Sequence, residues 1–281
     1  MNKVGLSTPY SIDEKLFKMY KDAGIEYMEI SVPTKEYDGL DFENIKKWSE
    51  QYGINIWSFH LPFFPFDKLD ISRDDLKEAS IKYHKSFIDK ATDIGIDKFV
   101  IHASGEPIKE EDRPKRMACA KNSLYILAEY AKEKNAIILV EDLPRTCLGR
   151  DSSDILDLIS AHPDLRVCFD TNHLLSEDMS EFIEKVGDKI VSTHISDYDF
   201  VNERHWLPGE GKIDWQGLIN KLQEVNYNEM WLYELNMGFL NTINRSRELT
   251  LDDVVKNANE LFEGKELTVI STPKKNLGFW D

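Results

Sequence analysis

The stretch KVGLSTPYSIDEKLFKMYKDAGIEYMEISV, residues 3–32, contains the pattern that decides the fold. It begins and ends with short apolar runs, which are typical of β-strands. Between these runs, Leu16, Met19 and Tyr20 share one face of an amphipathic helix that Gly24 can end. The stretch therefore predicts a strand, a helix and a second strand.

The same alternation continues along the chain. The expected strands are residues 3–7, 26–32, 54–60, 97–103, 136–142, 165–170, 189–195 and 230–236. A second long helical pattern spaces its apolar residues three or four apart: Leu76, Ala79, Tyr83, Phe87 and Ala91. Several of the strands are apolar at consecutive positions, which is expected of parallel strands covered on both faces.

Eight strands that alternate with helices over about 250 residues indicate an α/β fold, the (β/α)₈ TIM barrel. The alternative is an open doubly wound sheet, but the chain lacks the GxGxxG that a dinucleotide fold would place after its first strand. No Pro/Gly/Ser-rich linker divides the chain. We therefore expect a single domain over residues 1–281, with residues 266–281 as a C-terminal extension whose apolar LGFW end covers an apolar patch or meets a partner subunit.

The composition narrows the class of protein. A hydrophobic content of 41% is enough for a sizeable core, and the formal charge of −16 disfavours binding to a phosphate backbone. The chain has no apolar window of about 18 residues, and its N-terminus lacks the apolar core of a signal peptide. We expect a soluble, cytoplasmic protein without nucleic-acid or membrane partners. Cys119, Cys147 and Cys168 have no CxxC spacing, which predicts reduced thiols.

Possible metal ligands stand at the carboxyl ends of six expected strands. In chain order they are His60, His102, Glu141, Asp170, His194 and Glu234. His173 follows closely in the motif DTNH. Because the strand ends of a barrel converge on one mouth, we expect these side chains to face one another.

Each of these residues also has a plainer interpretation. A single histidine that ends an apolar strand is usually a hydrogen-bonded structural residue, and we interpret His84 and His162 as structural or surface residues. Glu26, Glu29 and Asp97 are interpreted as ordinary charges at the barrel rim.

The set as a whole predicts a metal site. Glu141 and Glu234 directly follow apolar runs, and burying such carboxylates costs several kcal/mol unless a cation or hydrogen-bond donors compensate. Together with Asp170 and His194 they predict one divalent metal ion. Three carboxylates and one imidazole suit Mn²⁺, Mg²⁺ or Co²⁺, with Zn²⁺ as the alternative.

The fragments FHLP, VIHAS, LVEDLPR, CFDTNH, THISDYD, ERHWLPGEGKIDW and LYELN occur in this order along nearly the whole chain. With this order and spacing the sequence resembles the xylose isomerase-like barrels, which comprise sugar isomerases and epimerases and the endonuclease IV-type DNA repair enzymes. Resemblance to the tagatose/psicose 3-epimerase-like branch implies four metal ligands: Glu141, Asp170, His194 and Glu234. It also implies that Glu141 and Glu234 act as bases. By the same resemblance or by position, the substrate-binding residues are His60, His102, His173 and His205.

The repair-enzyme branch has nearly the same frame, with extra histidines that hold three zinc ions. This chain has counterparts for those histidines, but it has Glu203 where that branch has Asp, and the role of Glu203 stays open. Its LPF, EDLPRT and DTNHLL segments differ from the corresponding loops. A zinc-dependent phosphodiesterase acting on abasic DNA is therefore one alternative, and a non-catalytic carbohydrate-binding barrel is another.

The loop after the seventh strand, residues 194–215, is expected to fold back over the mouth. The two glycines of LPGEG permit a tight backbone course there, and His205 would then face the substrate. We interpret Glu210 as a solvated loop residue and Asp214 as the cap of the helix that follows.

These observations predict a divalent-metal-dependent isomerase or epimerase of a sugar or sugar-like carbonyl compound. A metal ion that binds two neighbouring substrate oxygens acidifies the C–H beside the carbonyl and stabilises the enediolate. Glu141 or Glu234 would remove that proton, and the other would return one. Return to the opposite face gives epimerisation, whereas return to the neighbouring carbon gives isomerisation. The expected partner is a small sugar, without a phosphate-binding signature, and the resemblance allows a homo-oligomer.

Overall fold

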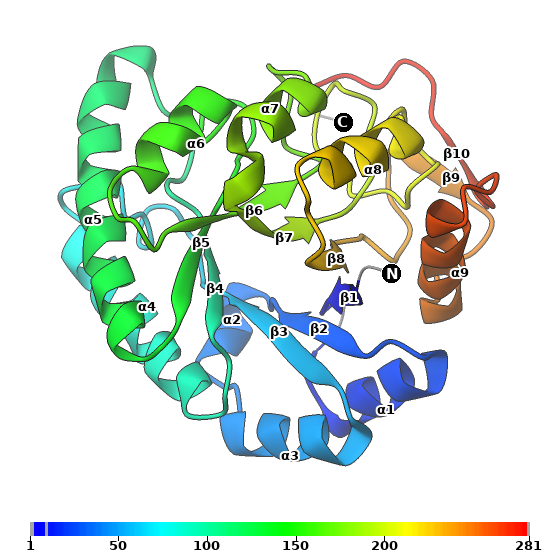
Figure 1. Cartoon of the computed structure of the whole chain (residues 1–281), viewed down its shortest axis with the longest axis horizontal. Coiled ribbons are helices and arrows are strands. Elements are labelled where there is room, and N and C mark those ends of the chain that lie inside the picture. The colour runs from blue at the N-terminus through cyan, green and yellow to red at the C-terminus, as the bar shows by residue number, and fades with distance from the viewer. Residues whose placement is uncertain (1–2, 9–10, 280–281) are drawn as a thin grey trace.

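Eight parallel strands form the centre of the molecule (Figure 1). The computed structural model describes residues 3–8 and 11–279. The strands are β1 (Lys3–Ser7), β2 (Tyr27–Ile30), β3 (Asn55–His60), β4 (Lys98–Ile101), β5 (Ile137–Glu141), β6 (Arg166–Asp170), β7 (Ile190–His194) and β8 (Met230–Tyr233). Each lies within one of the eight ranges that the sequence predicts.

The strands follow one another around a barrel. The hydrogen-bonded order is β7-β6-β5-β4-β3-β2-β1-β8, and the pairing between strands is parallel. Just beyond β7, the amide of Ile195 donates to the carbonyl of Leu232 at 2.8 Å, and the amide of Glu234 donates to the carbonyl of Ile195 at 3.1 Å. These bonds bring β7 and β8 together, so the sheet is a nearly closed (β/α)₈ barrel rather than an open doubly wound sheet.

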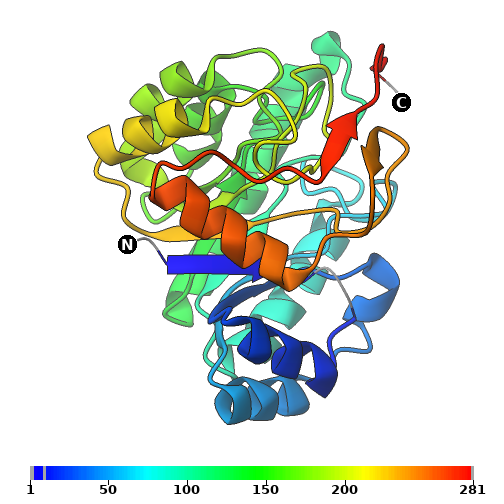
Figure 2. The same cartoon turned by 90° about the vertical axis from the view of Figure 1, so that its right-hand side faces the viewer.

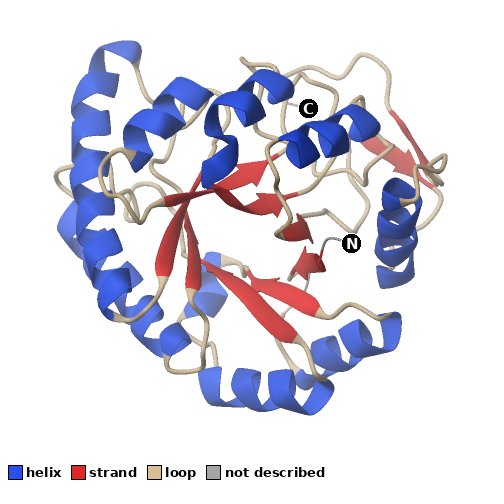
Figure 3. Ribbon diagram, viewed as in Figure 1, coloured by secondary structure: helices blue, strands red, loops and turns tan. Residues whose placement is uncertain are grey.

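Helices surround the strands as an outer layer (Figure 3). They are α1 (Glu14–Ala23), α2 (Thr34–Tyr37), α3 (Phe42–Tyr52), α4 (Lys77–Thr92), α5 (Arg113–Glu133), α6 (Ser152–Ile159), α7 (Met179–Val186), α8 (Trp215–Glu224) and α9 (Leu251–Phe262). The main hydrophobic core lies between this layer and the outward faces of the strands. Cys119, Cys147 and Cys168 are buried free thiols, as predicted.

Helix α1 shows how local sequence defines the elements. The Asp13 carboxylate accepts a hydrogen bond from the amide of Leu16, which satisfies a free donor of the first turn. Gly24 ends the helix in the left-handed region, at φ 81°, where a glycine carries no steric penalty. Leu16 and Tyr20 are buried as predicted, and Met19 is partly buried against the core.

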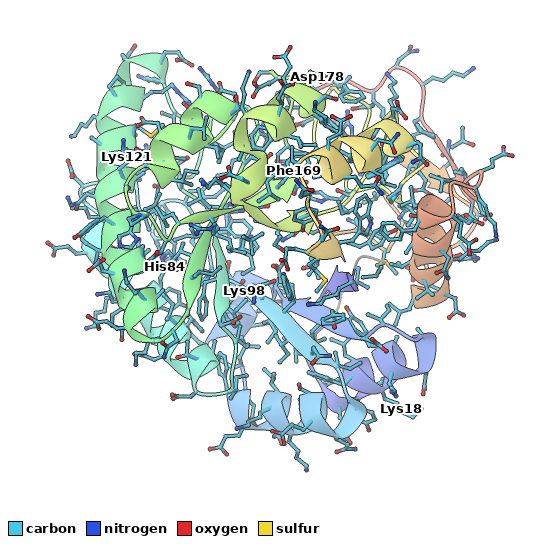
Figure 4. The ribbon with its side chains drawn as sticks, viewed as in Figure 1. Lys18, His84, Lys98, Lys121, Phe169 and Asp178 are labelled. Atoms are coloured by element: carbon cyan, nitrogen blue, oxygen red, sulfur yellow. The ribbon has the colours of Figure 1, made fainter. Side chains whose placement is uncertain are left out.

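The second predicted helix is present, but its buried face is shifted. Phe87 and Ala91 are buried in α4, whereas Ala79 is exposed. Ser80, Ile81 and His84 join the buried face of α4, and Ala79 lies off that face. His84 is thus a buried histidine of the outer helical layer (Figure 4).

The C-terminal extension packs against the loop that follows β7. In it, β10 (Ser271–Pro273) pairs antiparallel with β9 (Ile243–Arg245), and the Ser271 hydroxyl donates to Glu210 Oε1 at 2.6 Å. Figure 2 shows the extension, in red, running from α9 along this side of the molecule. The last two residues of the predicted LGFWD end, 280–281, lie outside the described residues.

Within residues 3–8 and 11–279, none of the helices has the length and apolar character needed to cross a membrane.

Candidate functional site

The two-residue repeat of the strands brings the predicted metal ligands into the barrel mouth. Leu139 and Cys168 are buried together inside the barrel, and Leu232 is also buried. Two positions further along the chain lie Glu141 and Asp170, at the ends of β5 and β6, and Glu234, directly after the end of β8. Because side chains two residues apart on a strand point to the same face, these carboxylates stand above the apolar layer.

His194 completes the group. One ligand atom from each of Glu141, Asp170, His194 and Glu234 lies within 4.8 Å of the others. His194 Nδ1 is 2.9 Å from Glu141 Oε1, 3.4 Å from Glu234 Oε2 and 4.0 Å from Asp170 Oδ2. The structure therefore brings together all four residues predicted as metal ligands, and the side chain of Glu234 remains 26% exposed toward the mouth.

Asp170 is the residue in this group that most needs a cation. Its Oδ1 accepts a hydrogen bond from the amide of Asn172 at 2.7 Å, but its buried Oδ2 has no hydrogen-bond partner among the described residues. Burial raises the pKa of Asp170 well above its ordinary value, and the Glu234 and Glu141 carboxylates raise it further. A divalent cation would remove this penalty, so the donor set fits a metal ion.

The imidazoles of the mouth favour the ionised form of both glutamates. Burial opposes ionisation of Glu141, but the imidazoles of His194 and His102 outweigh it and place the pKa of Glu141 well below its usual value. Burial also opposes ionisation of Glu234, and His194 and His205 lower the pKa of this carboxyl overall. Both glutamates are therefore held as carboxylates, the form required of a metal ligand or a base.

A second group lies beside the first and shares Glu141. His60 Nε2 and His102 Nε2 each lie 3.0 Å from Glu141 Oε2. The other ring nitrogen of His60, Nδ1, lies 2.9 Å from the carbonyl of Leu61, which directs Nε2 into the mouth. The ring of Phe63 stacks on His102 at a centroid distance of 4.0 Å. By geometry, His60, His102 and Glu141 could also hold a metal ion.

A third group contains Glu203, whose role the sequence left open. His173, Glu203 and His205 offer ligand atoms within 4.8 Å of one another. His173 Nδ1 lies 2.7 Å from the carbonyl of Asp142, and its Nε2 lies 3.4 Å from Glu203 Oε1. All four histidines predicted to bind substrate thus line the same mouth, together with Glu141, Glu203 and Glu234.

Arg145 and Glu106 are mouth residues that the sequence reasoning missed. The Arg145 guanidinium contacts Glu203 at 3.1 Å and donates from Nε to Glu106 Oε1 at 2.9 Å. Arg145 has φ 56°, which is unusual for a residue with a side chain, and Glu203 has a lowered pKa. Burial opposes that lowering, and His173, His205 and Arg145 outweigh it. The sequence feature that could have revealed Arg145 is its place four residues after Glu141, the carboxylate that ends β5.

Two adjoining hollows lie at the mouth. The inner one has a volume of about 160 Å³ and is lined by the predicted histidines and glutamates together with Phe63, Phe66 and Arg145. The outer one, of about 510 Å³, shares His205 and Glu234 with it. Ligand pockets typically span about 300–1,000 Å³, so the two hollows together offer room for a small polar molecule.

The loop after β7 has the tight course that its glycines predict. Gly209 has φ 93°, and a Cβ on Gly211 would lie 2.2 Å from Asp197 Oδ1. Asp214 caps α8, also as predicted. The interpretation of Glu210 as solvated is wrong: it is 2% exposed and pairs with Arg245 Nη2 at 2.8 Å. The C-terminal extension and β9 cover it, which no local pattern around Glu210 reveals.

Glu29 was also wrongly interpreted as a rim charge. It is fully buried inside the barrel, and Ser58 donates a hydrogen bond to its Oε2 at 2.7 Å. Glu26 and Asp97 are exposed, as expected. The signal for Glu29 was a carboxylate in the middle of the apolar run YMEI, where it cannot reach solvent.

Known proteins resemble this chain over part or most of its length. A protein of Methanocaldococcus jannaschii, MJ1188, which has no described function, is 24% identical over 266 residues, covering 92% of this chain and 97% of the relative. Fructoselysine 3-epimerase of Escherichia coli O157:H7 is 26% identical over 123 residues, or 41% of this chain and 44% of the enzyme. The crystal structure of a D-tagatose 3-epimerase-like protein superimposes with a TM-score of 0.75 at 19% identity, covering 83% of this chain and 90% of that one.

The fold and the mouth geometry agree with a match to one protein family. The family described as xylose isomerase-like TIM barrel matches residues 17–257. Because this match spans well over half of the chain, the protein belongs to the xylose isomerase-like TIM barrel family.

Proposed function

We propose that the protein is a divalent-metal-dependent isomerase or epimerase that acts on a sugar or a sugar-like carbonyl compound. One observation carries the proposal: three carboxylates and one imidazole converge within 4.8 Å at the open end of the barrel, and a buried oxygen of Asp170 has no hydrogen-bond partner among the described residues. A structural site would satisfy that oxygen with backbone or side-chain donors.

The proposed ligands are Glu141, Asp170, His194 and Glu234. This mixed oxygen and nitrogen set suits Mn²⁺, Mg²⁺ or Co²⁺, with Zn²⁺ as the alternative. When bound, the metal would supply Lewis acidity, which makes the C–H beside a coordinated carbonyl easier to deprotonate.

Glu141 and Glu234 are the proposed proton carriers. Both are held as carboxylates, and both line the inner hollow. One would remove the proton beside the substrate carbonyl, and the other would return a proton. Return on the opposite face is epimerisation, which the names of the fructoselysine and tagatose 3-epimerase relatives favour over transfer to the neighbouring carbon.

The four histidines of the mouth are proposed to bind the substrate. His60 and His173 each place one ring nitrogen against a backbone carbonyl, which leaves the other nitrogen facing the mouth. Such fixed rings can donate to or accept from sugar hydroxyls. His102 and His205 line the same hollow.

The charge of the mouth favours an uncharged substrate. Arg145 is a guanidinium that lines the inner hollow, and it already contacts the carboxylates of Glu106 and Glu203. A phosphate group would have to compete with both carboxylates for this arginine. A free ketose or a neutral ketose derivative therefore fits better than a sugar phosphate.

The alternatives receive less support. The DNA phosphodiesterase would need metal at the His60–His102–Glu141 and His173–Glu203–His205 groups in addition to the first site. Fructoselysine 3-epimerase and the D-tagatose 3-epimerase-like fold neighbour carry the names of sugar epimerases, and these names favour neither this alternative nor the non-catalytic carbohydrate-binding barrel.

The test combines metal analysis with an isotope assay. Protein loaded with Mn²⁺ should bind one ion per chain, and a panel of unphosphorylated ketoses in deuterated water should yield an epimer or isomer with deuterium beside the carbonyl. Three metal ions per chain, together with cleavage of an abasic-site duplex after zinc loading, would support the phosphodiesterase instead. A protein that binds metal and ketose without turnover or exchange would support the carbohydrate-binding barrel.

A further inference from the structure

A buried carboxylate lies directly behind the proposed metal ligand His194. Glu29 belongs to β2, across the barrel from β7, and has no exposed surface. Its Oε1 lies 3.0 Å from His194 Nε2, whereas His194 Nδ1 faces Glu141 at 2.9 Å. The two ring nitrogens of His194 therefore face different partners, one behind the site and one within it.

The surroundings of Glu29 hold its carboxylate in place. Ser58 donates to Oε2 at 2.7 Å, and Ser7 donates to Oε1 at 3.3 Å. These donors compensate part of the cost of burying the carboxylate. Because Ser58 and Ser7 both donate to the Glu29 carboxylate, it has little freedom to turn away from His194.

We propose that Glu29 is a positioning residue, whose carboxylate keeps the proton of His194 on Nε2 and leaves Nδ1 free to bind the metal. Metal-binding histidines commonly direct their second nitrogen to a carboxylate, which sets the tautomer and the ring orientation. Glu29 acts through His194 rather than on the substrate, because it has no surface at the mouth. The inference rests on the proposed metal site.

The His194 ring is not yet aligned with the Glu29 carboxylate. His194 Nε2 and Glu29 Oε1 are 3.0 Å apart, which is hydrogen-bond distance. The N–H direction does not point at the oxygen, so the two atoms do not form a hydrogen bond in this ring orientation. A small rotation of the ring, as Nδ1 engages a cation, would align Nε2–H with Glu29.

The test measures metal affinity rather than catalysis. Glu29→Met keeps the approximate size and removes the acceptor, whereas Glu29→Gln keeps an amide oxygen that can still accept from Nε2–H. Titration with Mn²⁺ should show binding that is about 10–100-fold weaker in the Met variant and less affected in the Gln variant. Asp70→Asn is the matched control, because Asp70 is another buried carboxylate, bound by Ser72, Arg116 and the amide of Gly105, outside the metal site.

A spectroscopic readout separates positioning from a general loss of structure. In Mg²⁺-saturated protein with ¹⁵N-labelled histidine, His194 should show a protonated Nε2 and an unprotonated Nδ1, and Glu29→Met should mix the two tautomers. The Asp70→Asn control should keep both the wild-type affinity and the wild-type spectrum even if it unfolds more easily.

The outcomes distinguish this inference from the proposed function. If wild-type protein binds Mn²⁺ but both Glu29 variants bind it equally well with unchanged His194 signals, the role of Glu29 is wrong and the metal site stands. If wild-type protein binds no divalent metal, the proposed function fails, and the role of Glu29 fails with it. Should Glu29→Met not fold, Glu29→Asp takes its place, because its shorter side chain withdraws the carboxylate from His194 Nε2. Weaker Mn²⁺ binding or altered His194 signals in Glu29→Asp would support the inference, and wild-type values would overturn it.

Discussion

Two buried aspartates, Asp170 in the mouth and Asp197 in the loop above it, have the same exposure and different surroundings. Both are 0% exposed. Asp197 Oδ1 accepts from the amides of Tyr198 and Ile213, and its Oδ2 accepts from the amide of Gly209 and the indole of Trp215. Asp170 Oδ2, in contrast, has no hydrogen-bond partner in the described part of the chain.

The difference fits a structural role for Asp197 and the proposed ligand role for Asp170, which also lies within 4.8 Å of three other donor side chains. Asp197 uses both oxygens to organise the loop, and four donors compensate its burial. Asp170 stands beside Glu141 and Glu234, and His173 Nε2 lies 3.4 Å from its Oδ2 without forming a hydrogen bond, so a cation or a proton can compensate this oxygen. Burial raises the pKa of both groups, and therefore it is the hydrogen-bond pattern that separates them.

The largest effect is expected from Asp170→Ala. This change should abolish stoichiometric metal binding and, with it, turnover, while the metal-free protein keeps or gains thermal stability because an uncompensated carboxyl group is removed. Elemental analysis and thermal unfolding in the presence of a chelator would measure both. Full metal content in the variant would contradict the assignment of Asp170 as a ligand.

Glu141→Gln and Glu234→Gln should have the next largest effect. Each keeps one oxygen ligand but removes a base, so turnover should fall by about 10²–10⁴-fold even where metal remains bound. Turnover and solvent deuterium exchange should be measured at matched metal content. Near-normal turnover in both variants with metal bound would exclude the two-glutamate mechanism.

His84 extends the comparison to histidines. Burial lowers the pKa of His84 to about 4, and its Nε2 lies 2.9 Å from the carbonyl of Pro62, away from the carboxylates that surround His194. In the unfolded chain, His84 takes up a proton when the pH falls below its ordinary pKa of about 6.5. In the folded chain, His84 stays neutral until the pH falls to about 4. The contribution of His84 to stability is therefore complete above pH 6.5 and is lost as the pH falls toward 4.

The corresponding measurement is urea unfolding at neutral and acidic pH. Between pH 7 and pH 4.5, wild-type protein should lose roughly 2–3 kcal/mol more stability than a His84→Gln variant, which cannot take up this proton. Equal losses in the two proteins would show that His84 is not the group responsible.

The smallest effect is expected from Asp197→Asn. The substitution replaces one carboxylate oxygen by an NH₂ group, which cannot accept the two hydrogen bonds that this oxygen accepts. The free energy of unfolding should therefore fall by about 1–3 kcal/mol. Metal content should stay at the wild-type level, since Asp197 is not a ligand. Loss of metal from this variant would remove the distinction between the two aspartates.

Much of the fold and the proposed ligand set could be predicted from sequence alone. Alternation of apolar runs with amphipathic stretches predicted all eight barrel strands, because strand and helix periods are local properties of the chain. Strand ends converge in a barrel, so the positions of Glu141, Asp170, His194 and Glu234 were enough to predict that they meet.

Only the tertiary structure decided which other charged residues are buried and what they contact. Glu29 meets His194 across the barrel, Arg145 meets Glu203 from another loop, and Glu210 is covered by a segment far along the chain. These contacts depend on side-chain directions and loop paths that no local periodicity encodes. The sequence determined which residues carry charge at each strand, and the closed barrel determined whether that charge is satisfied by the protein or left for a ligand.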